Sequence, residues 1–247
     1  GDTGKDIEGL LAHYPFDGDT DDHSNHTNNG TLSAGSFGSG VFGQALVFDG
    51  TNYVMVPDSD DLDLTADFSI CFWINPIDGA QRNVLTKHQS GVDNDGSWAI
   101  KYYDNKLVFN SYDSNTGPGY HNTSLPVNQW SFVTFTYNDT SGLYQVYFNG
   151  SLDYSETVDV QVNNTSLDLY ISSVNAGKYF FSGSLDEIRI YSRVLTEPQV
   201  QQIYNNNRME LQGTDLVGSW PGQGVWYRNS DTGQFVQLYS VDAEMVV

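Results

Sequence analysis

Short runs of alternating apolar and polar residues, separated by clusters of Gly, Asn, Asp and Ser, recur along most of this 247-residue sequence. Alternation with a period of two is typical of β-strands with one buried face, and the clusters supply turn residues. The expected strands span residues 10–16, 44–49, 53–57, 68–76, 83–88, 97–103, 106–112, 130–138, 144–150, 152–158, 167–173 and 183–193. So many strands with a single helix favour two stacked antiparallel sheets over an α/β fold.

The one expected helix spans residues 196–205, "TEPQVQQIYN". Thr196 is a good N-cap residue, and Gln199 follows three positions later, as in a capping box. Val200 and Ile203 fall on one face, so we expect a short amphipathic helix that lies against the sandwich.

The pattern of residues changes after residue 208. Residues 209–247 read as two or three further strands with a hairpin turn at "SDTGQ". These strands are too few to bury a core of their own. We therefore expect a domain at residues 1–208 and the start of a following repeat module at 209–247. Packing of this tail on the sandwich and pairing with another copy are both open at this stage.

The charge balance is strongly acidic, with 10 Lys and Arg against 31 Asp and Glu and a formal net charge of −21. Such a potential repels nucleic acid and anionic membranes, and no apolar run has the length of a transmembrane helix. The sequence thus predicts neither nucleic-acid binding nor membrane insertion. The acidity suits divalent cations and neutral or cationic partners, with solubility in salty surroundings as the alternative reading. Cys71 lies in an apolar run and is expected to be a buried structural thiol.

Several motifs occur in a recognisable order: "GLLAHYPFDGDTDDHSNHTNNGTL", "FGQALVFDGTNYVMVPDSDDLDLTADFSICFWINP", "NQWSFVTFTYNDTSGLYQVYFNG" and "GSLDEIRIYSRVLTEPQVQQIY". In these motifs the sequence resembles the laminin-G-like, concanavalin-A-like jelly-roll modules of secreted and surface proteins, which are related to pentraxins. The resemblance covers roughly residues 8–206 and implies an all-β, two-sheet antiparallel jelly-roll sandwich with one short C-terminal helix. Such modules serve adhesion, glycan binding or spacing between catalytic units. The tail "WPGQGVWYRNSDTGQFVQL" resembles one unit of the tandem Gly-Trp-Tyr repeats of bacterial surface proteins.

In the resembled superfamily a calcium ion commonly ties the first strand to the last. The resemblance implies Ca²⁺ as a cofactor here, with the following ligands: Asp17, Asp22, the carbonyl of Gly50, and Asp186. Calcium prefers such a mixture of carboxylate and carbonyl oxygens, and two close carboxylates without a cation would repel each other. The alternative is that Asp186 accepts backbone hydrogen bonds or pairs with Arg189 or Arg193. The acids of "PDSDDLDLT" are expected to be solvated turn residues.

Saccharide sites combine flat aromatic faces with polar hydrogen-bonding groups, because sugars have apolar faces and polar rims. Loop residues that fit this description, and that we expect to be exposed and to bind a ligand, are Tyr112, Tyr120, His121 and Tyr179. Trp98 and Tyr103 are expected near the same end. The alternative is that these tyrosines pack and the neighbouring asparagines form turns. Trp73 and Trp130 lie in apolar runs and are expected in the core.

Glycan cleavage on this fold needs two carboxylates at a fixed separation. The expected concave strands carry no such pair, and no nucleophile elbow, Walker loop or dinucleotide fingerprint occurs. The sequence therefore predicts that the chain is not an enzyme. The favoured function is a calcium-stabilised carbohydrate- or surface-binding (adhesion) module of a larger secreted or cell-surface protein, extracellular and microbial. Its expected partners are a glycan or cell-surface ligand and the neighbouring domains. A structural spacer without a ligand and a polysaccharide-active enzyme are the alternatives.

Overall fold

The computed structural model describes residues 8–88, 98–111, 121–160, 162–175 and 177–210 and three later strands, with side chains as far as residue 205. The chain divides into two compact units, Gly1–Gln202 and Ile203–Val247. The boundary between the units falls within the helix α1 (Glu197–Glu210). Among the described residues, no helix has both the length and the apolar character needed to cross a membrane.

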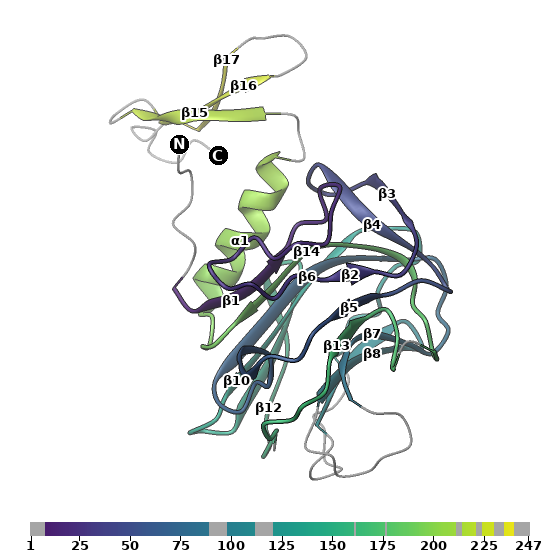
Figure 1. The fold of residues 1–247 in the computed structure, drawn as a ribbon. Coiled ribbons are helices and arrows are strands. Elements are labelled where there is room, and N and C mark those ends of the chain that lie inside the picture. The colour runs from purple at the N-terminus through teal and green to yellow at the C-terminus, as the bar shows by residue number, and fades with distance from the viewer. Residues whose placement is uncertain are drawn as a thin grey trace. The chain divides into compact units, whose positions relative to one another are not determined.

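The first unit is a sandwich of two antiparallel sheets (Figure 1). The larger sheet has eight strands. In spatial order, seven of them are β12 (Ser151–Thr157), β11 (Leu143–Phe148), β10 (Ser131–Asn138), β6 (Phe68–Pro76), β14 (Ser182–Tyr191), β4 (Gln44–Asp49) and β3 (Ser36–Ser39). The eighth, β1 (Leu10–Tyr14), pairs with the second half of β14, whereas β4 pairs with its first half.

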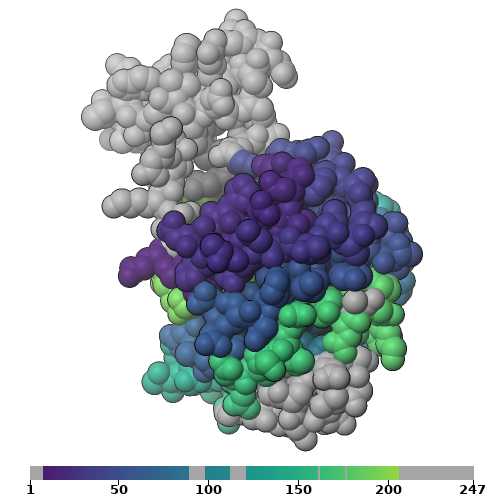
Figure 2. Space-filling model, in the orientation of Figure 1, coloured from purple at the N-terminus to yellow at the C-terminus, as the bar shows by residue number. Residues whose placement is uncertain are grey.

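The second sheet has six strands. Their order is β2 (Thr31–Leu32), β5 (Val54–Val56), β13 (Leu169–Ile171), β7 (Arg82–Lys87), β8 (Trp98–Tyr103) and β9 (Lys106–Ser111). The pairing of β13 with both β5 and β7 brings distant parts of the sequence together. Figure 2 shows this mixing on the molecular surface, where the purple N-terminal segment, the blue segment and the green segment near residue 170 adjoin one another. The all-β sandwich with one short helix confirms the fold predicted from the sequence.

The core between the sheets is rich in aromatic side chains. The Phe68 ring stacks on Phe109 of the opposite sheet, with ring centroids 5.0 Å apart, and Trp98 stacks on Phe109 at 6.0 Å. All three side chains are fully buried. Replacing one such ring with a methyl group usually costs about 3–5 kcal/mol, so this cluster holds the two sheets in place.

Two tryptophans and the cysteine were expected to be buried. Trp73 is 4% exposed and packs against Phe132, with ring centroids 5.3 Å apart. Trp130 is only half-buried, so its prediction as a core residue is wrong; it precedes β10 rather than lying within it. Cys71 is fully buried, and burial raises the pKa of its thiol to about 12, which confirms an unreactive structural thiol.

The helix α1 begins one residue later than expected and continues to Glu210. The Gln199 side chain accepts hydrogen bonds from the backbone N–H and the hydroxyl of Thr196, at 3.0 and 3.1 Å, which is one half of the predicted capping box. Val200 is fully buried, as the predicted apolar face requires.

Three short elements were not predicted: β2, β3 and the single 3₁₀ turn η1 (Asp60–Leu62). The strand β3 forms a hairpin with β4, and the turn between them spans residues 40–43. In the second unit, β15 (Thr214–Trp220), β16 (Gly224–Asn229) and β17 (Phe235–Tyr239) form a three-stranded antiparallel sheet. These strands agree with the expected texture of the tail, and the domain limits 1–208 and 209–247 stay predictions.

Candidate functional site

Two adjacent acids, Asp186 and Glu187, are buried in the middle of β14, with exposed fractions of 0% and 3%. The pairing of β14 with β6 shifts register at this point, and Glu187 has a φ of 55°, which together define a β-bulge. Leu185 and Ile188, on either side, both belong to the core. Because neighbouring residues of a strand point to opposite faces, the bulge turns both acids away from the core.

Asp186 fixes the turn between β3 and β4. One carboxylate oxygen, Oδ2, accepts hydrogen bonds from the backbone N–H groups of Val41 and Phe42, at 2.7 and 3.0 Å. The other, Oδ1, is buried without a hydrogen-bond partner. Burial, and then the charge of Glu187, raise the pKa of Asp186 to about 8. The alternative reading in which Asp186 accepts backbone hydrogen bonds is thus correct for one oxygen only.

Asp17 holds the same turn from the other side. Its Oδ1 accepts a hydrogen bond from the backbone N–H of Gln44 at 2.6 Å. A Cβ atom at Gly43 would collide with this oxygen, and one at Gly40 would lie 2.6 Å from Asp186 Oδ2. Two of the four predicted calcium ligands therefore contact the residue 40–44 turn. We call Asp17, Asp186 and this turn the acidic turn site.

Gly50 does not belong to the acidic turn site. The register pairs Ser182 with Asp49 and Leu185 with Leu46, so the position opposite Asp186 is five residues before Gly50. At about 3.4 Å per residue the separation along the strand is roughly 17 Å, which is too far for a shared ion. The prediction that the Gly50 carbonyl and Asp186 bind the same ion is therefore wrong.

Asp22 organises a different segment. Its Oδ1 accepts hydrogen bonds from the backbone N–H groups of His13 and Ser24, both at 2.9 Å, and its Oδ2 accepts from Ser24 Oγ at 2.9 Å and from Asn28 N at 3.1 Å. These bonds attach residues 22–28 to β1. The structure gives Asp22 this structural role, in keeping with the frequent use of Asp in turns.

The acidic turn site offers calcium two carboxylate groups. Within the described residues there is no group of three or more His, Cys, Asp or Glu side chains that could hold a metal ion. Calcium also accepts backbone carbonyl oxygens and water, so two carboxylates beside a turn are a chemically suitable start. The buried, unpartnered Oδ1 of Asp186 is the feature of this site that fits a cation.

Glu187 belongs to an ionic network instead. Its Oε2 lies 2.8 Å from His13 Nε2 and 2.5 Å from Arg189 Nη2. Burial alone would raise the pKa of Glu187, but Arg189 and His13 outweigh burial and lower it. The network ties β1 to β14 and leaves the neighbouring carboxyl, Asp186, without a basic partner in the ion pairs found among the described residues.

A second feature lies on the outer face of the six-stranded sheet. Leu169 and Ile171 point into the core, so Tyr170 between them points outward. The Tyr53 ring lies 5.8 Å from Tyr170 and 6.4 Å from Phe180, measured between centroids, and all three side chains are half-buried. These three residues, which we call the aromatic cluster, present ring surface to solvent.

A small pocket of about 150 Å³ adjoins the aromatic cluster. The residues that line it are Gln81, Asn83, His88, Lys101, Val174 and Tyr179, and we call it the β7–β8 pocket. Asn83 pairs with Lys101 across β7 and β8 and forms a β-bridge with Phe180 of the aromatic cluster. The backbone N–H of Asn83 donates a hydrogen bond to the Tyr179 carbonyl at 2.8 Å. Main-chain pairing thus fixes both walls of the pocket.

The four tyrosine and histidine residues predicted to bind a ligand have different outcomes. Tyr179 lines the β7–β8 pocket and is 56% exposed. His121 is 1% exposed, because its Nε2 accepts a hydrogen bond from the backbone N–H of Leu107 at 2.7 Å. Its prediction as an exposed residue is therefore wrong. Tyr112 and Tyr120 lie outside the described residues. Trp98, expected at the same end, is a core residue.

The sequence reasoning missed most of this surface. Tyr53 and Tyr170 occupy outward positions of alternating runs, a signal that was readable within each run. Their proximity was not readable, because it depends on the long-range pairing of β5 with β13.

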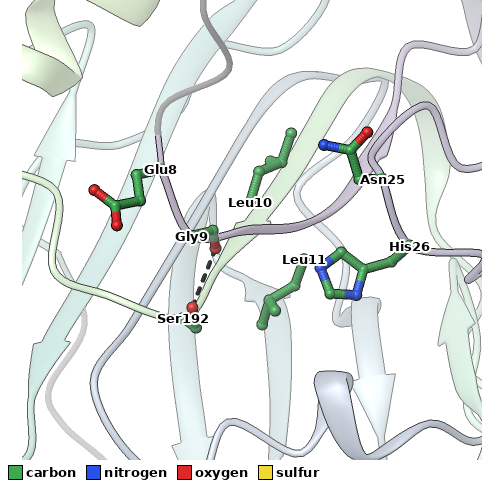
Figure 3. Close-up of a pocket in the computed structure, with 7 residues that line it drawn as sticks. All are labelled: Glu8, Gly9, Leu10, Leu11, Asn25, His26 and Ser192. Carbon is green, nitrogen blue, oxygen red and sulfur yellow. Dashed lines mark hydrogen bonds between the residues drawn. The ribbon is translucent and has the colours of Figure 1, made fainter.

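A wider pocket of about 400 Å³ lies at the start of β1 (Figure 3). It is lined by Glu8, Gly9, Leu10, Leu11, Asn25, His26 and Ser192. His26 Nδ1 is engaged with Asp61 Oδ2 at 2.7 Å, and Ser192 Oγ donates to the Gly9 carbonyl at 3.3 Å. None of its described lining residues is Tyr, Trp or Phe, so it offers no flat ring to a sugar.

The sheet order and the closing pair of β1 with β14 define a sandwich of the concanavalin-A-like class. The profile of the family Laminin_G_3, described as the concanavalin A-like lectin/glucanases superfamily, matches residues 48–201, and the chain belongs to this family. The comparison with curated protein sequences gives no match.

Solved structures share the fold. Domain 4 of AbnA, a GH43 extracellular arabinanase from Geobacillus stearothermophilus in complex with arabinotriose, has a TM-score of 0.63 and 23% identity over 79% of this chain and 98% of its own. The binding domain of botulinum neurotoxin DC in complex with SialylT has a TM-score of 0.62 and 19% identity over 86% of this chain and 54% of its own. The receptor binding domain of botulinum neurotoxin type G has a TM-score of 0.62 and 17% identity over 81% of this chain and 51% of its own. The chain thus spans about half of the neurotoxin domains.

Proposed function

We propose that the sandwich is a non-catalytic carbohydrate-binding domain of a secreted or cell-surface protein, and that its ligand binds on the outer face of the six-stranded sheet. The observation that carries this proposal is the β7–β8 pocket beside the aromatic cluster. Sugars stack their apolar faces on aromatic rings and give their hydroxyl groups to amide and charged side chains. Tyr179, Asn83 and Gln81 supply both kinds of group within one pocket.

The similar structures support this proposal at the level of ligand class. One of them is a domain of an extracellular arabinanase in complex with arabinotriose, and another is a toxin binding domain in complex with SialylT. The absence of Asp and Glu from the described pocket-lining residues favours binding over cleavage, since glycoside hydrolysis ordinarily uses two carboxyl groups.

The test is a glycan array with the intact chain, followed by calorimetric titration of the best ligand. Tyr179→Ala should weaken that ligand by about tenfold, because stacking on one exposed ring contributes on the order of 1 kcal/mol or more. Leu152→Ala is the matched control, since Leu152 is 45% exposed but lies on β12 of the other sheet. A ligand that binds both variants as tightly as the parent protein would place the site elsewhere.

A structural spacer is the competing function. It predicts that no glycan on the array binds above background, with or without calcium. The half-buried aromatic cluster and the polar pocket favour the binding function, because a spacer has no need for ring surface that faces solvent beside an amide-lined cavity.

We also propose that calcium binds at the acidic turn site, with Asp17 and Asp186 as its carboxylate ligands and carbonyl oxygens of the residue 40–44 turn completing the set. The support is the unpartnered Asp186 Oδ1 and the shared turn. A hard cation supplies positive charge between the two carboxylates, and the chain itself holds them against the turn through the backbone hydrogen bonds described above.

A further inference from the structure

The aromatic cluster and the β7–β8 pocket together extend across three strands of the six-stranded sheet, and we call them the combined site. In that sheet β13 lies between β5 and β7 (Figure 1). Tyr53 directly precedes β5, and Asn83 of β7 lines the pocket, so their backbones are about two strand spacings, roughly 10 Å, apart. Phe180 connects them, because its ring lies 6.4 Å from Tyr53 and its backbone pairs with Asn83. The combined site is therefore longer than a single sugar ring.

The rings of the aromatic cluster do not lie in one plane. Tyr53 is inclined by 33° to Phe180 and by 56° to Tyr170. A sugar stacks with its apolar face on a ring, so sugars bound to differently inclined rings must turn relative to one another. A single chain in solution can turn in this way, whereas the face of a crystalline polysaccharide presents its sugars in a common plane and matches coplanar rings. The cluster thus favours a single soluble chain.

The pocket supplies polar contacts beside these rings. Gln81 and Asn83 line it, and their amide groups both donate and accept hydrogen bonds, as sugar hydroxyls require. Tyr179 adds a ring that is 56% exposed. The pocket volume of about 150 Å³ is below the roughly 300 Å³ at which drug-sized ligand pockets begin. The pocket therefore suits one sugar ring, and a longer ligand must continue onto the aromatic cluster.

The charge of the protein disfavours an acidic ligand. Its formal net charge of −21 repels anions, and the connection between β7 and β8 carries two of the acids, Asp93 and Asp95. Lys101 and His88 line the pocket, but both already interact with other groups of the protein. A neutral sugar needs neither of these basic side chains and is not repelled by the acids. The charge therefore favours a neutral ligand.

We infer that the combined site binds a neutral oligosaccharide of at least two residues as a single soluble chain. One sugar residue occupies the β7–β8 pocket against Tyr179, and the next stacks on the rings of Tyr53 and Phe180. This assignment rests on the proposed carbohydrate-binding function and adds the charge, the minimum length and the physical form of the ligand. Two adjoining positions make the affinity depend on chain length.

The experiment titrates the intact chain with three neutral series: malto-, cello- and arabino-oligosaccharides of one to four residues. Calorimetry measures the longer ligands, and NMR titration the weak monosaccharides. In at least one series the affinity should rise about tenfold from one residue to three, because the second position adds stacking on further rings. The best oligomer with its terminal primary alcohol oxidised to a carboxylate should bind several-fold more weakly, an effect that high salt should reduce. Microcrystalline cellulose should not retain the protein in a pull-down.

Two substitutions separate the two sugar positions. Tyr53→Ala should weaken the trisaccharide about three- to tenfold and leave the monosaccharide unaffected, because only the second position loses a ring. Tyr179→Ala should weaken ligands of every length. Tyr53→Phe keeps the ring and should bind as the parent protein does, and Leu152→Ala is the control on the other sheet. A melting scan of each variant checks that it is folded.

The outcomes distinguish this inference from the proposed function. An affinity that does not change with chain length would overturn the inference, and so would a Tyr53→Ala variant that loses the monosaccharide and the trisaccharide equally. Weaker binding by Tyr179→Ala in the same titrations would still support the proposed site. Tighter binding of the oxidised oligomer, or retention on microcrystalline cellulose, would also contradict the inference. If none of the three series binds, the inference fails, and the proposed function fails as well only if the glycan array gives no ligand.

Discussion

Asp186 is a buried carboxyl group in which one oxygen is bonded twice and the other not at all. Calcium at the acidic turn site would bind only the folded state, so it should raise the free energy of unfolding by linkage. Removing calcium with a chelator should lower the thermal midpoint of unfolding by several degrees, since 1 kcal/mol corresponds to about 2–4 °C in a chain of this size. Differential scanning fluorimetry measures the shift.

The substitution Asp186→Asn tests whether the calcium response depends on the Asp186 carboxylate. The amide removes a poorly compensated buried acid, so the variant in chelator should be at least as stable as the parent protein, while its calcium response should disappear. Asp19→Asn is the control, because Asp19 lies close to Asp17 in the sequence but its side chain is 51% exposed. Equal midpoints of the parent protein in calcium and in chelator would end the calcium proposal.

Lys87 is the opposite case, a buried cation with a full set of oxygen partners. Its Nζ donates hydrogen bonds to Asp58 Oδ1 at 2.5 Å and to the carbonyl of Leu167 at 2.7 Å, and it forms an ion pair with Asp63 Oδ1 at 3.0 Å. Lys87→Met should lower the free energy of unfolding by about 3–5 kcal/mol, because it leaves the Asp63 carboxylate without its cation, and the Asp63 side chain is only 2% exposed. Urea titration measures this. Adding Asp63→Asn should recover part of the loss, whereas Lys178→Met at an exposed position should change stability by less than about 0.5 kcal/mol.

His121 gives the protein a pH dependence. Burial lowers the pKa of His121 to about 4, below the ordinary value near 6.5. Between these values the unfolded chain binds more protons than the folded one, so the free energy of unfolding falls as the pH drops from about 6.5 to 4. The loss amounts to about 3 kcal/mol at most. Urea titrations at pH 7, 5.5 and 4.5 should show a shallower decline for His121→Gln than for the parent protein.

The glutamine can still accept the Leu107 N–H, so the comparison isolates the titration. His23→Gln serves as the control, because the His23 side chain is 47% exposed. A decline that is identical in His121→Gln and in the parent protein would assign the pH dependence to other groups.

Single residues show where sequence reasoning stops. Asp63 was expected to be a solvated turn residue, yet it is 1% exposed because Lys87, 24 positions later, reaches it from β7. Nothing in the local pattern around "PDSDDLDLT" distinguishes this acid from its exposed neighbours. The alternation did predict that Asp186 lies in a strand. The resemblance predicted that Asp186 and Asp17 share a calcium ion, which stays a prediction; the turn that both side chains contact belongs to a hairpin that the sequence did not reveal.

At the scale of elements, predictability depended on strand length and apolar content. The long strands β6, β10 and β14 have clear alternating patterns and were located almost to the residue. The strands β2 and β3 have two and four residues, and they form because longer strands offer free edges for pairing. The bulge in β14 was marked by two adjacent acids, although its consequence depends on register, which a single strand does not encode.

The β3–β4 turn carries the element-scale prediction. Gly43 has a φ of 49°, and a side chain there would displace Asp17. Gly43→Ala should destabilise the protein by about 1–3 kcal/mol and also reduce the calcium-dependent rise in the thermal midpoint. Gly142→Ala, at a φ of 68° in the turn between β10 and β11, introduces similar strain far along the sequence from both acids. An undiminished calcium response in Gly43→Ala would remove Asp17 from the ligand set.

At the scale of the whole molecule, the fold is shared by the three domains compared above, which are at most 23% identical to this chain. Such domains keep the sandwich and change the surface, so the fold does not select the ligand. In this chain the outer face of the six-stranded sheet carries the amide-lined β7–β8 pocket and the aromatic cluster. The sequence revealed the total charge, but the position of Lys101 at the β7–β8 pocket depends on the pairing of β7 with β8.

The net charge of −21 should itself limit stability, because like charges repel more strongly in the compact state than in the unfolded chain. Raising NaCl from 0.1 to 1 M shortens the Debye length from about 10 to about 3 Å and screens this repulsion. In the presence of chelator, the thermal midpoint should therefore rise by roughly 3–6 °C, corresponding to about 1–2 kcal/mol. KCl should act equally, since screening depends on ionic strength, whereas millimolar calcium adds too little ionic strength to act in this way. A midpoint that stays constant or falls with salt would show that the acidic surface is already compensated in the folded state.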